Sequence, residues 1–245
     1  MDLSEKLISI AENEQRAADA NAQLEQILYG TDTGGKSYYD FFWDELQDSG
    51  NRNHYESAFR NWNCEEIIPK YPLTTSTANN VFSSNKLLKS CPPIIPTTDT
   101  IIYYNCFSAC NNLVEINFDI RPSNLSTALT STFNGCFKLI TIKNIVSTDD
   151  VKYQSVTFGS CNSLKNISFE GVIGTSINFQ WSPLSKASFE NIVEHLSPTV
   201  TGQSVTFKQS AVESAFGVTI ADEATYTGEF NTWRNSKLNW TFNYV

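Results

Sequence analysis

The most regular hydrophobic pattern in the chain is a repeat of about 25 residues. Its first position is a phenylalanine, at Phe82, Phe107, Phe133 and Phe158, with spacings of 25, 26 and 25 residues. The positions three, six and nine residues later hold Asn85, Leu88 and Cys91, then Cys110, Leu113 and Ile116, then Cys136, Leu139 and Ile142, then Cys161, Leu164 and Ile167. Similar residues at equivalent positions indicate stacked coils, because each buried residue then packs on its counterparts in neighbouring coils. We expect the cysteines to act there as small buried hydrophobic residues.

Strands are predicted at 113–118, 139–143 and 164–169, where apolar residues such as Ile116 and Phe118 alternate with polar ones. Strands of successive coils should pair in parallel, about 4.8 Å apart. The outward positions then form two rows, Glu115, Thr141 and Asn166 in the first and Asn117, Lys143 and Ser168 in the second. These six residues are the candidate binding face, with a merely solvated face as the alternative. The loops at 119–126 and 146–150 are equally good candidates.

Residues 1–29 are predicted to form an N-terminal helix, since 2–28 contain no glycine or proline. Spacings of four and three give a heptad seam through Leu3, Leu7, Ile10, Glu14, Ala17, Asn21, Leu24 and Leu28. All of these residues except Glu14 are the candidate oligomerisation or docking residues. Glu14 would bring like charges together in a parallel dimer or trimer. A single amphipathic helix that packs on its own domain or on a partner therefore stays open.

The repeats need caps at both ends, because an open coil face exposes apolar surface. After a glycine-rich linker at 30–37, the aromatic residues of 38–62 predict two short helices, and 38–80 is interpreted as a helical cap and connector. In the C-terminal cap, 181–245, Ser185 is a predicted N-cap for a helix at 186–196, and 204–207 and 240–244 are predicted strands. Trp181, Trp233 and Trp240 could stack on sugar rings, but a core or cap role is favoured.

Charge and composition exclude several classes of function. The net charge of −9 argues against nucleic-acid binding, which needs clustered lysine and arginine. No window reaches the roughly 20 apolar residues of a membrane span, and the N-terminus lacks the apolar core of a signal peptide. We therefore expect synthesis in a cytoplasm and no membrane insertion.

Candidate chemistry is sparse. Residues 30–37 match the phosphate-binding pattern G-x-x-x-x-G-K-S, but the preceding segment is a predicted helix rather than a strand, so nucleotide binding is not expected. The six cysteines are too few and too far apart for a disulfide scaffold. Only Cys106 and Cys110 are close, and His54 and His195 lie far from them, so no metal site is expected. No catalytic motif is recognised, and the predictions are no enzyme activity and no cofactor.

The frame Phe-x-x-Cys-x-x-Leu-x-x-Ile resembles the BspA-like leucine-rich repeats of bacterial surface proteins and phage or prophage structural proteins, over residues 81–170. Residues 182–196 resemble the terminal cap of such proteins, and 39–71 resemble the aromatic N-terminal part of the phage-associated ones. The resemblance implies an α+β fold, with a short leucine-rich-repeat solenoid of parallel strands at 81–180 between the N-terminal helix and helical cap and a C-terminal α/β cap. It also implies adhesion or particle assembly, and no catalytic residues.

Three functions follow from these observations. The first is a phage tail, baseplate or head-fibre component, located in the virion. It would form a homo-oligomer or bind other virion proteins, while its repeats recognise a host surface protein or glycan. The second is an adhesin on the bacterial cell surface, and the third is a cytoplasmic protein-interaction module. The absence of an export signal and wall anchor favours the first.

Overall fold

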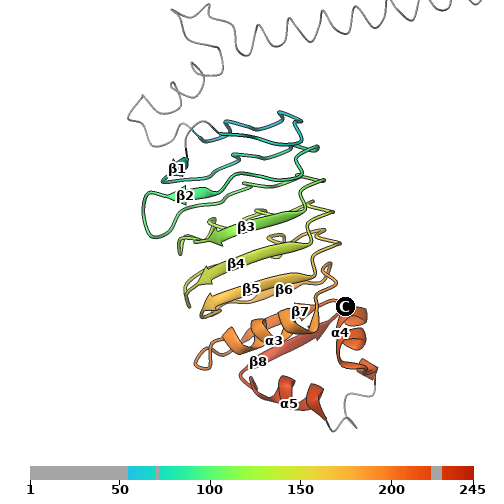
Figure 1. Cartoon of the computed structure of the whole chain (residues 1–245). Coiled ribbons are helices and arrows are strands. Elements are labelled where there is room, and N and C mark those ends of the chain that lie inside the picture. Colours follow the sequence, from blue (N-terminus) through green and yellow to red (C-terminus); the bar gives the residue numbers. More distant parts are fainter. Residues whose placement is uncertain (1–54, 70–71, 222–227) are drawn as a thin grey trace, which may run out of the picture. The chain divides into compact units, whose positions relative to one another are not determined.

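The computed structural model describes residues 55–69, 72–221 and 228–245. These residues form a mixed α/β structure of short parallel strands and three helices (Figure 1). Contacts divide the chain into the units Met1–Asn51 and Arg52–Val245. The predicted N-terminal helix with its seam residues, the linker at 30–37 and the aromatic segment at 38–54 lie outside the described residues.

The strands form three parallel sheets. The first pairs β1 (Leu73–Thr75) with β2 (Ile94–Pro96), and the second has the order β3 (Glu115–Ile120), β4 (Thr141–Ser147) and β5 (Asn166–Gly171). The third has the order β6 (Ile177–Phe179), β7 (Gln203–Phe207) and β8 (Trp240–Tyr244). The predicted strands of the repeats are confirmed, although β3, β4 and β5 each begin two residues later than expected.

The repeated phenylalanines stack face to face in the core. Ring centroids are 5.5 Å apart between Phe82 and Phe107, 5.6 Å between Phe107 and Phe133, and 5.7 Å between Phe133 and Phe158. All four rings are fully buried or nearly so. Equivalent apolar residues therefore pack on each other from copy to copy, as the spacing predicts, and we call this row of rings the phenylalanine ladder.

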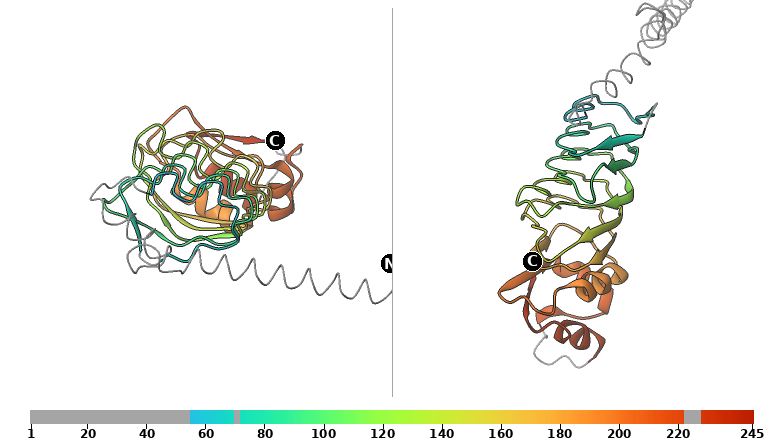
Figure 2. Two further views of the ribbon diagram at one scale, coloured as in Figure 1. Left: turned by 90° about the horizontal axis from the view of Figure 1, so that it is seen from above. Right: turned by 90° about the vertical axis from the view of Figure 1, so that its left-hand side faces the viewer.

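The turn around each phenylalanine is held by the next copy. The Phe82 N–H donates to the Cys106 carbonyl and the Phe107 N–H to the Thr132 carbonyl, both at 3.0 Å. Two residues after the phenylalanine the backbone is left-handed, as at Gly135 with φ 79°. Figure 2 shows these turns and the strands on separate sides of the molecule. Backbone hydrogen bonds thus join successive copies on both sides of the ladder.

The thiols three residues after the phenylalanines donate hydrogen bonds as well as filling space. Cys110 donates to the Phe82 carbonyl and Cys136 to the Phe107 carbonyl, both at 3.0 Å, and Cys161 donates to the Phe133 carbonyl at 3.2 Å. Each of these carbonyls already accepts a backbone N–H of its own copy, so the thiol adds a second hydrogen bond that links it to the next copy. The cysteine position is small and buried, as expected, and is also a donor position.

The predicted helical cap is wrong where it can be checked. Residues 55–61 form turns, with Ser57 and Asn61 left-handed at φ 60° and 62°, a conformation that a right-handed helix does not allow. Phe59 stacks on Phe82 with 5.5 Å between ring centroids. The Phe59 N–H donates to the Val81 carbonyl at 3.0 Å. This segment is a further copy of the phenylalanine turn.

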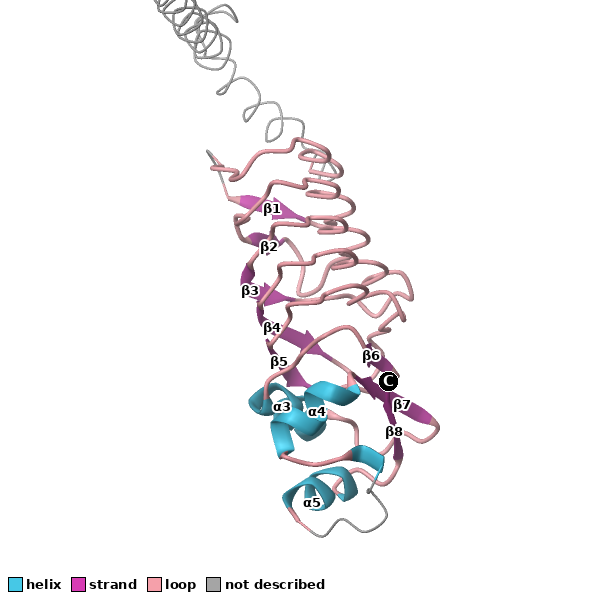
Figure 3. Ribbon diagram, turned by 90° about the vertical axis from the view of Figure 1, so that its right-hand side faces the viewer, coloured by secondary structure: helices cyan, strands magenta, loops and turns pink. Residues whose placement is uncertain are grey.

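All helices of the described residues lie in the C-terminal part of the chain, drawn in cyan in Figure 3: α3 (Lys186–His195), α4 (Gln209–Phe216) and α5 (Glu229–Asn235). The Ser185 side chain accepts a hydrogen bond from the Ser188 N–H, which confirms the predicted N-cap of α3. The predicted strands at 204–207 and 240–244 are confirmed as β7 and β8. The ladder continues into this region, since Phe179 stacks on Phe158 and on Phe207.

An aromatic cluster forms the rest of the C-terminal core. Phe189, Phe207 and Phe242 surround the buried Trp233, and the Trp240 Nε1 donates to the Ser197 carbonyl at 2.9 Å. Both tryptophans therefore have the favoured core role. Trp181 does not, because its side chain is 48% exposed.

Candidate functional site

The first predicted row of outward residues is in register. Glu115 pairs with Thr141, and Thr141 with Asn166, across the parallel sheet β3-β4-β5. None of the three is buried. The Asn166 Nδ2 donates to the Thr141 Oγ1 at 3.4 Å, so the row carries its own hydrogen bond. The alternation of apolar and polar residues was sufficient to place these three side chains together.

The second predicted row is broken by shifts of register. Asp119 lies three positions after Ile116 on β3, whereas their partners are two positions apart on β4. The strand β4 has the same extra residue relative to β5. Such bulges displace the residues that follow, so Asn117 and Lys143 do not pair. The Lys143 Nζ instead reaches the Asp119 Oδ1 at 3.2 Å, and Ser168 donates to the Lys143 carbonyl. All three residues face outward, as predicted, and Ser168 contacts Lys143, but the bulge removes the expected regular pairing of Asn117 with Lys143.

Four of the six predicted residues line one shallow groove. Thr141 and Lys143 of β4, and Asn166 and Ser168 of β5, border a depression of about 230 Å³. Its other side is the first half of α3, with Ser185, Ala187, Ser188 and Asn191, and its floor includes Ile142 and Ile167. We call this depression the strand-helix groove. Glu115 and Asn117 lie outside its lining.

Two of the α3 side chains also hold the edge of β5. The Ile167 N–H donates to the Ser188 Oγ at 3.0 Å, and the Phe169 N–H donates to the Asn191 Oδ1 at 2.7 Å. These are alternate residues of a strand that has no further strand beside it in its sheet. Residues three apart lie on one face of a helix, so Ser188 and Asn191 can supply the two acceptors. Sequence reasoning placed the start of α3 but missed this contact.

The groove presents hydroxyl groups, amides and one ammonium group. Lys143 is more than half exposed, and its ion pair with Asp119 is on the surface, where such pairs contribute little and exchange easily. Thr141 and Asn166 offer further donors and acceptors above an apolar floor. Such a surface can hydrogen-bond the hydroxyl, amide or carbonyl groups of a glycan or polypeptide.

The two candidate loops differ in character. At 119–126, the Arg121 guanidinium pairs with Asp119 at 3.3 Å, and Leu125 is about half exposed. At 146–150, Ser147 is buried and accepts a hydrogen bond from the Tyr153 hydroxyl at 2.7 Å, while Asp149 and Asp150 are exposed. Neither loop contributes a lining residue to the strand-helix groove.

The buried thiols are poor nucleophiles. Burial raises the pKa of the Cys110 and Cys161 thiols to about 12, and it raises the pKa of Cys91, Cys106 and Cys136 well above the ordinary range. The thiolate is the reactive form of cysteine, so these side chains stay protonated at neutral pH. Their position supports a role in packing.

Among the residues that the structure describes, no three histidine, cysteine or acidic side chains gather as metal ligands would. In the same part of the chain, no helix is long and apolar enough to cross a membrane. Comparison of the chain with protein-family models, with curated proteins and with solved structures gave no match.

Proposed function

We propose that the chain is a non-enzymatic leucine-rich-repeat protein whose repeats form a short solenoid with a binding surface. The observation that carries this proposal is the strand-helix groove, where Thr141, Lys143, Asn166 and Ser168 meet α3 on a surface built from equivalent positions of successive copies. A stack with a uniform core leaves its outward positions free to vary, which suits recognition better than catalysis. The protonated, buried thiols support the same conclusion.

The biological setting that we propose is a phage particle, as a tail, baseplate or head-fibre component that contacts a host surface protein or glycan. In this proposal the seam from Leu3 to Leu28 assembles a dimer or trimer, or docks on another virion protein. The support is the spacing of the seam and the resemblance of the repeat frame to phage structural proteins. A cell-surface adhesin and a cytoplasmic interaction module would carry the same repeats without particle association.

The oligomeric mass of the full chain, measured by light scattering, tests the assembly part of the proposal. We expect a dimer or trimer that becomes a monomer when Leu7 and Leu24 are both replaced by glutamine, because both would lie in the buried seam. The matched control changes Gln15 and Gln23, which lie outside the seam, to alanine. A monomeric parent chain would contradict self-assembly through the seam.

The location is tested with antibodies against the chain, applied to purified particles and to intact host cells. Labelling of particles is the expected result. Labelling of intact cells without particles would instead support an adhesin, and labelling only after cell lysis would support a cytoplasmic module.

A further inference from the structure

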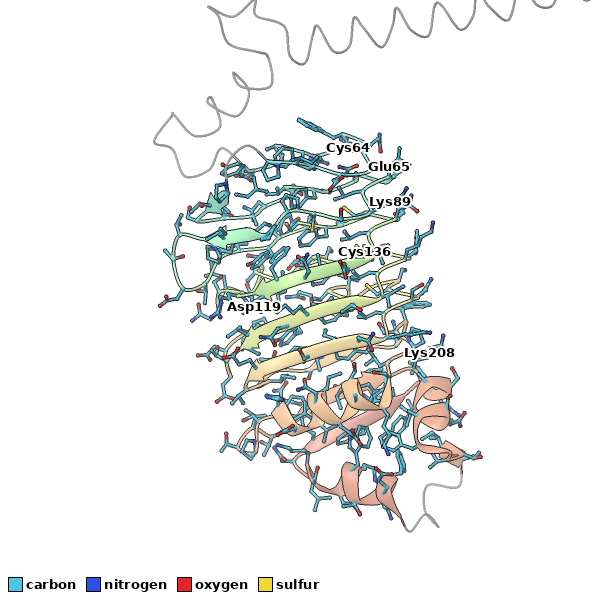
Figure 4. The ribbon with its side chains drawn as sticks, in the orientation of Figure 1. Cys64, Glu65, Lys89, Asp119, Cys136 and Lys208 are labelled. Atoms are coloured by element: carbon cyan, nitrogen blue, oxygen red, sulfur yellow. The ribbon has the colours of Figure 1, made fainter. Side chains whose placement is uncertain are left out.

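A second surface of the repeats lies at the edge between each phenylalanine turn and the following strand. It consists of the positions four, five and seven residues after each phenylalanine, and we call it the lysine edge. Its residues are Lys86, Leu87, Lys89, Asn111, Asn112, Val114, Phe137, Lys138, Ile140, Asn162, Ser163 and Lys165. Figure 4 labels Lys89 at this edge.

Backbone hydrogen bonds bring these residues side by side. The Val114 N–H donates to the Lys89 carbonyl at 3.1 Å, the Ile140 N–H to the Val114 carbonyl at 2.8 Å, and the Lys165 N–H to the Ile140 carbonyl at 3.0 Å. Equivalent residues of neighbouring copies are therefore about 4.8 Å apart, and the four copies span about 14 Å. The edge is one continuous surface.

The charge of this surface is opposite to that of the chain as a whole. The chain has 26 acidic and 17 basic residues, yet the four copies from Phe82 to Phe158 place four lysines and no carboxylate on this edge. The same row of backbone hydrogen bonds continues into the Phe59 copy, where the Lys89 N–H donates to the carbonyl of Glu65, so that end of the edge is acidic. Lys89 pairs with Glu65 at 2.7 Å, but both side chains are mostly exposed, so the pair is weak. Within the described residues, no ion pair is found for Lys86, Lys138 or Lys165. Three cations are thus available to a partner.

Apolar side chains lie between these lysines. Leu87, Val114, Phe137 and Ile140 are 46%, 38%, 44% and 40% exposed. Single exposed apolar residues are common, but here four occur on one edge of four copies. A partner that contacts the lysines would also cover these side chains.

The edge ends at a hollow of about 360 Å³ that Lys165 shares. Its wall is partly apolar, with Pro183, Leu184, Ala211 and Ala215, and its polar lining is Ser185, Lys186, Ser210 and Ser214. The Lys186 Nζ already pairs with Glu229 at 2.5 Å and lies 3.9 Å from Glu190. Lys165 is therefore the cation that the hollow offers to a partner.

We propose that the lysine edge binds an acidic polypeptide segment of a partner protein that also carries apolar side chains. Four to five extended residues span about 14 Å, so a short segment reaches from Lys86 to the hollow. Alternating carboxylates and apolar side chains match the lysines and the exposed apolar residues together. An anionic glycan or a nucleic acid would use the lysines and leave the apolar side chains uncovered. The hollow shares Ser185 with the strand-helix groove, but no residue of the lysine edge lines that groove, so the proposal does not depend on a ligand there.

The test uses the full chain and a short fluorescein-labelled peptide in which glutamate and leucine alternate, with binding followed by fluorescence anisotropy. We expect Lys138→Gln combined with Lys165→Gln to weaken binding roughly tenfold at low salt, because two charge pairs are lost. The control, Arg60→Gln with Lys152→Gln, changes the net charge equally at exposed positions outside the edge and should bind as the parent chain does. Circular dichroism checks that each variant is folded.

Further probes separate the kinds of partner. Replacing leucine by serine in the peptide, or Ile140 by serine in the protein, should also weaken binding. Polygalacturonate, an anionic polysaccharide, should compete poorly with the peptide. Absence of peptide binding, equal weakening in the control variant, or stronger binding of polygalacturonate than of the peptide would each overturn the proposal.

Discussion

Between Phe82 and Phe158 the core is built from equivalent positions of successive copies, whereas beyond Phe179 it is built from unlike aromatic side chains. In the repeats, rings stack nearly parallel, with an angle of 2° between Phe107 and Phe133. In the C-terminal region Phe189 meets Phe207 edge to face at 88°. In the repeats, the same ring-on-ring packing recurs from copy to copy. The last copy has a neighbouring copy on one side only, so its other side must be covered differently. The aromatic cluster covers that end, at the cost of periodicity.

The largest expected difference between the two regions is their response to alkaline pH, because the five buried thiols all lie in the repeats. An unfolded thiol loses its proton near pH 9, while Cys110 and Cys161 keep theirs in the folded protein up to a pKa of about 12. Above pH 9 the unfolded state therefore binds fewer protons than the folded state. The free energy of unfolding should fall by up to about 1.4 kcal/mol per pH unit for each thiol.

Urea titrations from about pH 8 to about pH 10, followed by circular dichroism, measure this fall. In a variant with Trp43 and Trp62 replaced by phenylalanine, tryptophan fluorescence reports on Trp181, Trp233 and Trp240 in the C-terminal region. Replacing Cys110 and Cys161 by alanine should make the pH dependence shallower. An unchanged slope in that variant would show that these thiols do not carry the effect.

Removal of one ring from the ladder should cost almost as much. Phe133→Ala deletes a fully buried side chain that stacks on both neighbours, and large-to-small changes of this kind cost about 3–5 kcal/mol. Phe137→Ala, in the same copy, removes a ring that is exposed and should change stability by less than about 0.5 kcal/mol. Urea unfolding compares the two variants, and equal effects would refute the ladder as the core of the repeats.

A backbone contact where the repeats meet the C-terminal region gives a smaller effect. A Cβ at Gly174 would lie 2.3 Å from the Asp149 carbonyl oxygen, so Gly174→Ala must shift the backbone and should cost roughly 2 kcal/mol. At Gly202, where φ is +73°, a Cβ meets nothing within 4 Å, and the cost should be closer to about 1 kcal/mol of backbone strain. Thermal unfolding measures the stability of both variants. A larger loss of stability in Gly202→Ala than in Gly174→Ala would contradict this contact.

The smallest predicted effect concerns the contact between α3 and β5. Asn191→Ala removes the acceptor of the Phe169 N–H and should cost about 1 kcal/mol, with faster amide exchange at Phe169. Glu194→Ala changes an exposed residue of the same helix and serves as the control. Unchanged exchange at Phe169 in Asn191→Ala would mean that the helix does not hold this strand edge.

The sequence predicts the repeats well because buried positions recur, and it predicts less where they do not. Phe59 was missed because Trp62 occupies the position of Cys110 in its copy, and Phe179 because Ser182 takes that position. The bulges in β3 and β4 were missed because alternation indicates which residues point outward but not where a strand gains a residue. The strand-helix groove was half predicted. Its β4 and β5 residues follow from alternation, whereas Ser188 and Asn191 come from a helix whose placement depends on tertiary packing.

Each copy keeps the same frame, with similar residues three, six and nine positions after the phenylalanine, and this regularity bears on how the chain can diversify. The return segment, from the last position of this frame to the next phenylalanine, varies in length. The next phenylalanine lies 16 positions after Cys91, 17 after Ile116, 16 after Ile142 and 12 after Ile167. The length of the return segment therefore differs between copies, while the ring and thiol positions keep their spacing. Grafted peptides should be accepted there too, which makes the return segments a place to display new sequences without rebuilding the scaffold.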